Sequence, residues 1–320
     1  MPDTPMAVVA GAVLSVEEGA SRVLLAKRAA SAHQGGKWEF PGGKRMAGEN
    51  ATQALVRELG EEIGIRAKAW RRLIRFPYAY PEFRMNFEVF RVTAWDGTAS
   101  GCEGQEVRWV PLPELRRWTT PPASLPVIRA LQLPPQYAIS ADPAGDASRW
   151  QADLSATLQR GAQLIQLRAH SLSGPAYERL AQEAIRRVHA AGAQIVLNCE
   201  PDQAVRLSAD GVHLTSARLM QLTVRPLPED LLVGASCHSP QELDQAVRID
   251  ADFAVLSPLR DSSRALGWER FASAIADAAL PVYALGGMNP EDQEAAVESG
   301  AQGIAAIRGL WGPVSRTGRR

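Results

Sequence analysis

The second half of this chain repeats one pattern, a short apolar run followed by a polar stretch with helical character. Eight runs follow one another between Tyr137 and Ile307: YAISA, AQLIQLR, QIVLN, GVHL, LLVGAS, FAVLS, PVYALGG and GIAAI. Strands that are apolar throughout are typical of a parallel sheet buried on both faces. Because strand and helix alternate so regularly, we predict a closed (β/α)8 barrel, with an open doubly wound sheet as the alternative.

The first half has a different rhythm, with mixed strands and one strong helix. The segments VVAGAVLSV, RVLLAKR, FEVFRVTAW and EVRWVPL are typical of strands. The segment LQLPPQ then carries paired prolines, which mark a boundary, and 320 residues favour two domains. We therefore predict an α/β chain with a first domain over residues 1–132, a linker over 133–136, the barrel over 137–312 and a basic tail over 313–320.

Composition limits the partners and the compartment. The 35 basic and 35 acidic residues cancel, so no global field attracts a nucleic-acid polymer. The three cysteines have no paired spacing, which favours a reducing compartment and neither disulfides nor a zinc site. The apolar run MAVVAGAVLSV is too short to span a bilayer and lacks the basic leader of a signal peptide. We expect a cytoplasmic protein without a membrane partner.

The segment ENATQALVRELGEEIGI predicts an amphipathic helix. Asn50 and Gln53 have the spacing of a capping box, and Gly64 is a typical C-terminal glycine. The predicted buried stripe comprises Leu55, Leu59 and Ile63. This helix is the best-defined element of the first domain.

The opposite side of this helix carries Glu58, Glu61 and Glu62 at spacings of three and four residues. Like charges at this spacing repel by about 0.2–0.5 kcal/mol per pair. A solvated acidic face is the simple alternative, but it explains neither the clustering nor the upstream pair Gly42–Gly43. A divalent cation explains both, because Mg²⁺ and Mn²⁺ prefer oxygen ligands and glycine lets a backbone carbonyl approach the ion.

These residues resemble the Nudix box. The match comprises Gly43, five residues, Glu49, seven residues, Arg57–Glu58–Leu59, one residue, Glu61–Glu62, one residue and Gly64–Ile65. The segments AKRAASAHQGGKWEFPGGK and PPASLPVI resemble the MutT-like branch, which hydrolyses oxidised guanine nucleotides. The resemblance implies an α/β/α sandwich around a mixed sheet, and cleavage of a nucleoside triphosphate to the monophosphate and pyrophosphate.

The same resemblance implies roles for individual residues, with Mg²⁺ or Mn²⁺ as the cofactor. The implied metal ligands are the Gly42 carbonyl, Glu58, Glu61, Glu62 and Glu103, the last of which is otherwise a surface loop charge. The implied catalytic residues are Glu58 for the attacking water, Arg57 to orient Glu58, and Glu103 at the metal site. The implied nucleotide-binding residues are Arg28, His33, Glu39, Phe40 and Ser124. Ser124 stands where the branch has a purine-reading asparagine, and its hydroxyl is shorter than an amide and rotates.

The second half resembles the thiamine phosphate synthase/TenI family, from Tyr137 to about Leu310. The segments IQLRAH, LNCE, GVHL, GASCHS and YALGGMNPED match that family's motifs in order, at predicted strand ends. His170 replaces the family's lysine, and Cys199 and Ala217–Arg218 stand where metal-binding aspartates are expected. We therefore expect no thiamine phosphate synthase activity.

The barrel is still expected to be able to hold a phosphorylated small molecule, because its paired glycines keep a phosphate-binding loop. The candidate lining residues are Gln166, Arg168, Asn198, His238, Arg264, Gly286 and Gly287. A scaffold that binds nothing is an equal alternative, and a thiazole tautomerase that uses His238 is a further option within the family.

Three functions remain open for the whole chain. The leading hypothesis is a Mg²⁺-dependent hydrolase of nucleoside triphosphates that converts 8-oxo-dGTP to 8-oxo-dGMP and pyrophosphate, which cleanses the nucleotide pool and so supports DNA repair. The second is a Nudix hydrolase for a thiamine-related diphosphate, and the third is a ligand sensor that uses the barrel.

Overall fold

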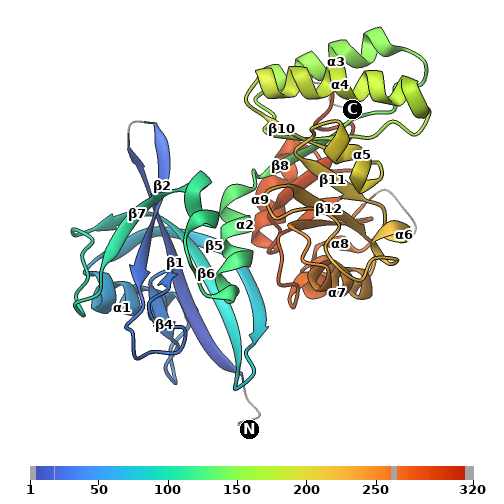
Figure 1. The fold of residues 1–320 in the computed structure, drawn as a ribbon. Coiled ribbons are helices and arrows are strands. Elements are labelled where there is room, and N and C mark those ends of the chain that lie inside the picture. Colours follow the sequence, from blue (N-terminus) through green and yellow to red (C-terminus); the bar gives the residue numbers. More distant parts are fainter. Residues whose placement is uncertain (1–4, 18, 261–264, 314–320) are drawn as a thin grey trace. The chain divides into compact units, whose positions relative to one another are not determined.

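The computed structural model describes residues 5–17, 19–260 and 265–313. The chain divides into two compact units, Met1–Gln132 and Leu133–Arg320 (Figure 1). Residues 133–136, the expected linker, belong to the second unit, in which Leu133 is buried and the first strand begins at Gln136.

The first unit is built on a mixed sheet. Its strands are β1 (Met6–Glu17), β2 (Ala20–Lys27), β3 (Trp38–Glu39), β4 (Gly42–Lys44), β5 (Arg66–Ala79), β6 (Arg84–Asp96) and β7 (Val107–Pro111). The main path runs β3-β2-β1-β6-β5, with β4 paired to β1 and β7 paired to β2. Because β1 runs parallel to β6 and antiparallel to β2, the predicted mixed sheet is confirmed.

Helices lie on both faces of this sheet, with α1 on one face and α2 on the other (Figure 1). The helices are α1 (Ala51–Ile63), α2 (Leu125–Gln132) and the 3-10 turns η1 (Leu112–Arg117) and η2 (Pro122–Ser124). The inner face of α1 packs on the sheet with a cluster that comprises Val13, Leu24, Leu55, Leu59, Ile63, Ile65, Ala67, Phe90 and Val92. The first unit is therefore the expected α/β/α sandwich.

The local signals of α1 are confirmed. The Asn50 side chain accepts from the backbone N–H of Gln53, and the Gln53 side chain accepts from the backbone N–H of Asn50 at 2.9 Å. Gly64 ends the helix in the left-handed conformation, at φ 69°. These two caps fix the ends of the segment that carries the glutamates.

Eight parallel strands among the described residues of the second unit close into a barrel, which excludes the open sheet. They are β8 (Gln136–Ile139), β9 (Leu164–Leu167), β10 (Gln194–Leu197), β11 (Gly211–Leu214), β12 (Leu232–Cys237), β13 (Phe253–Leu256), β14 (Val282–Leu285) and β15 (Gly303–Ala306). The helical segments are α3 (Ala147–Gln159), α4 (Gly174–Ala190), α5 (Pro201–Arg206), α6 (Ser216–Leu219), α7 (Pro240–Arg248), α8 (Gly267–Ile275), η3 (Pro290–Asp292) and α9 (Gln293–Glu298). The large rings of Tyr137, Phe253 and Tyr283 fill the barrel interior, so it is a packed core.

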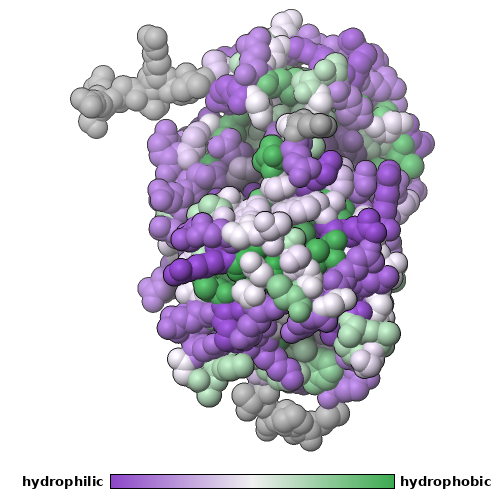
Figure 2. Space-filling model, turned by 90° about the vertical axis from the view of Figure 1, so that its left-hand side faces the viewer, coloured by the Kyte–Doolittle hydropathy of each residue, from purple (hydrophilic) through white to green (hydrophobic). Residues whose placement is uncertain are grey.

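The surface carries few large apolar side chains. Figure 2 shows mainly hydrophilic residues on the face turned to the viewer, with hydrophobic residues in small separate groups. Among the described residues, none of the helices has the length and apolar character needed to cross a membrane.

Candidate active site and barrel cavity

The paired glycines lie directly against the acidic helix. Gly43 faces Glu58, and a Cβ atom built on Gly43 would lie 2.4 Å from a carboxylate oxygen of Glu58. A Cβ atom on Gly42 would lie 2.2 Å from the carbonyl oxygen of Val9, since β4 pairs closely with β1 at this point. Gly42 therefore requires glycine, because its neighbours are backbone atoms and its φ is 153°. A side chain at position 43 would instead displace the Glu58 carboxylate.

Arg57 gathers the carboxylates of the helix and its entry loop. Its guanidinium donates to both oxygens of Glu49, at 2.7 and 3.0 Å. Its Nη1 atom also donates to Glu58 at 2.9 Å and to Glu61 at 3.0 Å. The hydrogen bonds from Arg57 lower the pKa of Glu49 to about 2. The bond expected between Arg57 and Glu58 is present, and it is charge-assisted.

Glu62 lies at the centre of a second group of carboxylates. Its Oε2 atom accepts a 2.7 Å hydrogen bond from the backbone N–H of Gly42. Burial raises the pKa of Glu62 to about 7, and the charges of Glu39, Glu103 and Glu58 add to that rise. The acidic groups are therefore close enough to repel one another.

The loop that carries Glu103 is tied to the end of α1. Gln105 donates from Nε2 to the carbonyl oxygen of Glu62 at 2.8 Å, and the N–H of Cys102 donates to the same oxygen at 2.9 Å. Gln105 also accepts from the N–H of Glu103 at 2.9 Å. The structure thus brings Glu103 to the acidic cluster from a distant part of the sequence.

The donor set fits a hard divalent cation. Carboxylate oxygens of Glu58, Glu61, Glu62 and Glu103 and the carbonyl of Gly42 are ligands that Mg²⁺ and Mn²⁺ accept. The mutual repulsion around Glu62 is the kind of strain that a cation relieves. Among the described residues, no three acidic, cysteine or histidine side chains already form a metal-ready cluster. In this arrangement Arg57 donates to Glu58 and Glu61, and the N–H of Gly42 donates to Glu62.

A cavity of about 270 Å³ begins at the paired glycines and runs along the sheet. Every residue assigned to nucleotide binding from the sequence lines it: Arg28, His33, Glu39, Phe40 and Ser124. Gly42 and Gly43 line the same cavity, so one wall of it is also the wall of the acidic cluster. The structure therefore joins the two sets of predicted residues into one site.

Arg28 orders one side of this cavity. It forms an ion pair with Glu39 and donates from Nε to the carbonyl oxygen of His33 at 2.9 Å. Burial raises the pKa of Glu39, and the neighbouring Arg28 opposes that rise. Arg28, Glu39 and His33 are thus connected to one another at the cavity wall.

Aromatic side chains form a further wall of the cavity that was not predicted from the sequence. Tyr80 and Phe87 line the cavity, and the rings of His33 and Tyr80 meet edge to face at 4.8 Å. Phe83 contacts His33 in the same way, at 5.0 Å. The segment FPYAYPEF carried the signal, because alternate aromatic residues in a hairpin face one side.

The mouth of the barrel holds a separate cavity of about 320 Å³. Gln166, Arg168, Asn198 and His238 all line it, as do His170, His213 and Ser236. Gly286 and Gly287 are not among its described lining residues. The backbone N–H of Asn289, two residues after Gly287, donates to Asp292 at 3.0 Å. Arg264 lies outside the described residues.

A buried hydrogen-bond chain supports this second cavity. The hydroxyl of Tyr137 lies 3.0 Å from Nδ1 of His213, and Nε2 of His213 lies 2.9 Å from Oγ of Ser236. Burial lowers the pKa of His213 to about 3, so its ring is neutral near pH 7. Because the Tyr137 hydroxyl is buried and needs an acceptor, it donates to Nδ1, and Nε2–H then donates to Ser236. Ser236 itself lines the cavity.

A mixed sheet between two helices, with clustered carboxylates at one end of a cavity, is the architecture of a Nudix hydrolase. Family models agree with both halves of the chain: a NUDIX domain matches residues 12–130 and a thiamine monophosphate synthase domain matches residues 137–310. The chain therefore belongs to the Nudix family through its first unit and to the thiamine monophosphate synthase/TenI family through its second.

Curated relatives match one unit each. The 8-oxo-dGTP diphosphatase of Escherichia coli is 38% identical over 112 residues, which cover 35% of this chain and 87% of that protein. That of Haemophilus influenzae is 45% identical over 29% of this chain and 68% of its own length. A putative thiamine-phosphate synthase of Aquifex aeolicus is 30% identical over 55% of this chain and 97% of its own length. The first unit is thus a MutT-like Nudix domain, and the second resembles a synthase barrel.

Proposed function

We propose that the first unit hydrolyses nucleoside triphosphates to monophosphates and pyrophosphate, with 8-oxo-dGTP as its preferred substrate. One observation carries this proposal: the cavity lined by the nucleotide-binding residues ends at Gly42 and Gly43, whose other side contacts the acidic cluster. A base in the cavity therefore directs its phosphates toward the carboxylates. The two diphosphatase relatives support the choice of nucleotide.

The acidic cluster would hold Mg²⁺ or Mn²⁺ through Glu58, Glu61, Glu62, Glu103 and the Gly42 carbonyl. A bound divalent ion neutralises charge on the phosphates and acidifies a water. The chain's own residues position the attack. Glu58 accepts the proton of the attacking water, and Arg57 holds the Glu58 carboxylate in place by its 2.9 Å hydrogen bond.

Base recognition depends on the hydrogen-bonding groups in the cavity wall. Oxidation at C8 turns N7 of guanine from an acceptor into a donor, so a site with an acceptor there separates the two forms. Backbone carbonyl groups near Phe40 can supply that acceptor, and Phe40 is buried at the cavity wall. A buried group left unpaired by the wrong base costs about 1–3 kcal/mol.

A release assay tests this proposal against its alternatives. Purified full-length protein is incubated with dGTP, 8-oxo-dGTP and thiamine diphosphate, with and without Mg²⁺, and the phosphorus products are separated. Pyrophosphate release from 8-oxo-dGTP that depends on Mg²⁺ supports the proposal. Turnover of thiamine diphosphate alone supports the second hypothesis, and binding without turnover supports a sensor.

As a second function, we propose that the barrel cavity binds a phosphorylated small molecule. The favouring observation is Gln166, a polar side chain that is only 3% exposed and lines the cavity. Its amide can offer both a donor and an acceptor to a ligand. We also expect that the full chain fails to complement a bacterium that lacks thiamine phosphate synthase; growth of such cells would contradict this.

A further inference from the structure

The barrel family implies a metal ion at the ends of β10 and β11, and the residues present here do not fit one. Cys199 follows β10, and burial raises the pKa of its thiol to about 11. A neutral thiol is a poor ligand for Mg²⁺, which takes oxygen ligands. Ala217, after β11, has no ligand atom in its side chain.

Arg218 connects the two strand ends instead. Its Nη1 atom donates to the carbonyl oxygen of Cys199 at 3.0 Å, and its other terminal nitrogen pairs with the carboxylate of Glu200. The Arg218 side chain is 25% exposed, so it is held in place but reachable. A metal ion at this point would meet a fixed positive charge at close range.

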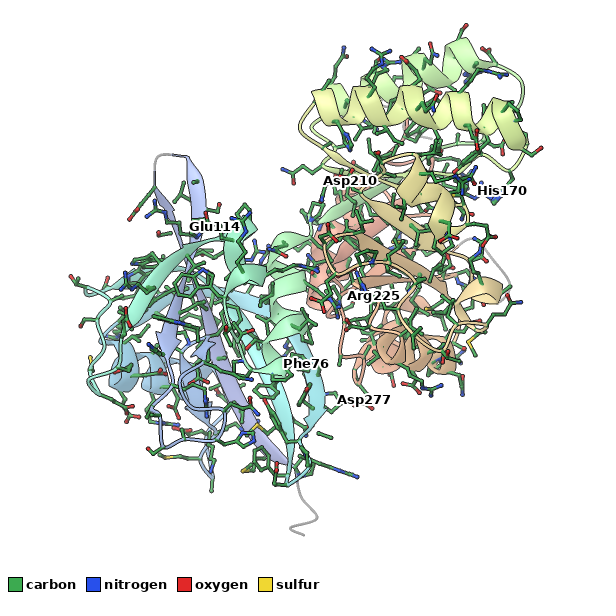
Figure 3. The ribbon with its side chains drawn as sticks, in the orientation of Figure 1. Phe76, Glu114, His170, Asp210, Arg225 and Asp277 are labelled. Atoms are coloured by element: carbon green, nitrogen blue, oxygen red, sulfur yellow. The ribbon has the colours of Figure 1, made fainter. Side chains whose placement is uncertain are left out.

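Two arginines line hollows at the barrel mouth, Arg168 and Arg218. A second hollow of about 300 Å³, lined by Cys199 and Arg218, shares His170 and Asn198 with the Gln166 cavity. Figure 3 labels His170 on the loop that joins β9 to α4. Among the described residues that line the two hollows, Glu200 is the one carboxylate.

We propose that the barrel mouth binds the phosphate of its ligand without a metal ion, with Arg218 and Arg168 supplying the positive charge. This inference rests on the proposal that the barrel holds a phosphorylated ligand. Arg168 lines the Gln166 cavity, and its guanidinium has no acidic partner among the described residues. A planar guanidinium matches phosphate geometry with two parallel hydrogen bonds, which a lysine or a hydrated metal cannot reproduce. The amide of Gln166 then contacts the part of the ligand that carries no phosphate.

Arginine labelling by phenylglyoxal, read residue by residue by mass spectrometry, tests this in the full chain. The probe is inorganic pyrophosphate in excess EDTA, which removes any metal-dependent binding at the first unit. At a concentration tenfold above the dissociation constant, labelling of Arg218 and Arg168 should slow about tenfold. Arg186, which is exposed on α4, and Arg225, which pairs with buried Asp252, serve as unchanged controls. Figure 3 shows His170 and Arg225 in different parts of the barrel.

The outcomes separate this inference from the proposals on which it rests. Protection in EDTA that Mg²⁺ does not strengthen supports it, and Arg218→Gln should then remove the protection of Arg168. Protection that appears only with Mg²⁺ would overturn the metal-free site but leave a phosphorylated ligand in place. No protection under either condition would overturn both, and would leave the hydrolase proposal for the first unit untouched.

Discussion

The two units use an arginine in opposite ways at their expected phosphate sites. In the first unit, Arg57 gathers three carboxylates and so concentrates negative charge beside the cavity. In the second, Arg218 stands where carboxylates are missing and adds positive charge. An acidic cluster can bind phosphate only through a cation, whereas an arginine can bind it directly. On these proposals, the first unit binds phosphate groups through a cation and the second binds them through arginine.

The largest expected effect is a loss of turnover on changing the acidic cluster of the first unit. Glu58→Gln should lower kcat by about 10²–10⁴-fold, because the amide cannot take a proton from the attacking water. Steady-state pyrophosphate release with 8-oxo-dGTP measures it. Glu114→Gln, an exposed glutamate on η1 that Figure 3 labels, is the matched control and should be neutral. Turnover of Glu58→Gln at the level of the control would remove Glu58 from the mechanism.

The next largest loss of activity is expected from a change at Gly43, which lies close to Glu58. Gly43→Ala places a methyl group 2.4 Å from the Glu58 carboxylate, which must move. A displacement of this size should lower kcat by about 10²-fold. Gly60→Ala is the control, since its Cβ would meet only the carbonyl oxygen of Ile65, at 3.9 Å. We expect Gly60→Ala to keep full activity; equal activity in both variants would show that the packing of Gly43 on Glu58 is not needed.

The barrel buries a neutral histidine, His213, and this should make its stability depend on pH. Burial lowers the pKa of His213 to about 3, against about 6.5 in the unfolded chain. As the pH falls below about 6.5, His213 is protonated in the unfolded chain but stays neutral in the folded barrel. The free energy of unfolding therefore falls on acidification. From pH 7 to pH 5 the free energy of unfolding should fall by about 2 kcal/mol.

Urea unfolding of the barrel, followed at both pH values, measures this loss. His213→Asn cannot take the proton, so its stability should lack this part of the pH dependence, although its stability at pH 7 is lower because the Tyr137–His213–Ser236 chain is broken. The same fall between pH 7 and pH 5 in the variant would assign the effect to other groups.

The smallest expected effect concerns the base. The wild type should prefer 8-oxo-dGTP over dGTP in kcat/KM, and Ser124→Asn should widen that preference by about 1 kcal/mol or roughly fivefold, because an amide offers a donor and an acceptor together. Parallel measurements with both nucleotides decide it. Equal kcat/KM values in the wild type would defeat the preference, and an unchanged ratio in the variant would remove Ser124 from base recognition.

Much of the fold was readable from the sequence because its signals are local. The capping box, the terminal glycine and the buried stripe of α1 depend on residues within a few positions of one another. The apolar barrel strands were equally clear, since each is buried on both faces. Strand β5 was not anticipated, because its first half is mostly exposed and register shifts interrupt its alternation.

The candidate metal ligands Glu58 and Glu62 could be predicted from the sequence, because they lie with Gly43 on a single loop and helix. The distant groups that join them could be identified only from the packing of the whole chain. Glu103 reaches the cluster through hydrogen bonds to the end of α1, and Tyr80 reaches the cavity by strand pairing. In the barrel, Arg218 and Cys199 are 19 residues apart, yet parallel strands bring their ends together. Local spacing fixes a helix face, whereas contacts between distant segments depend on how the whole chain packs.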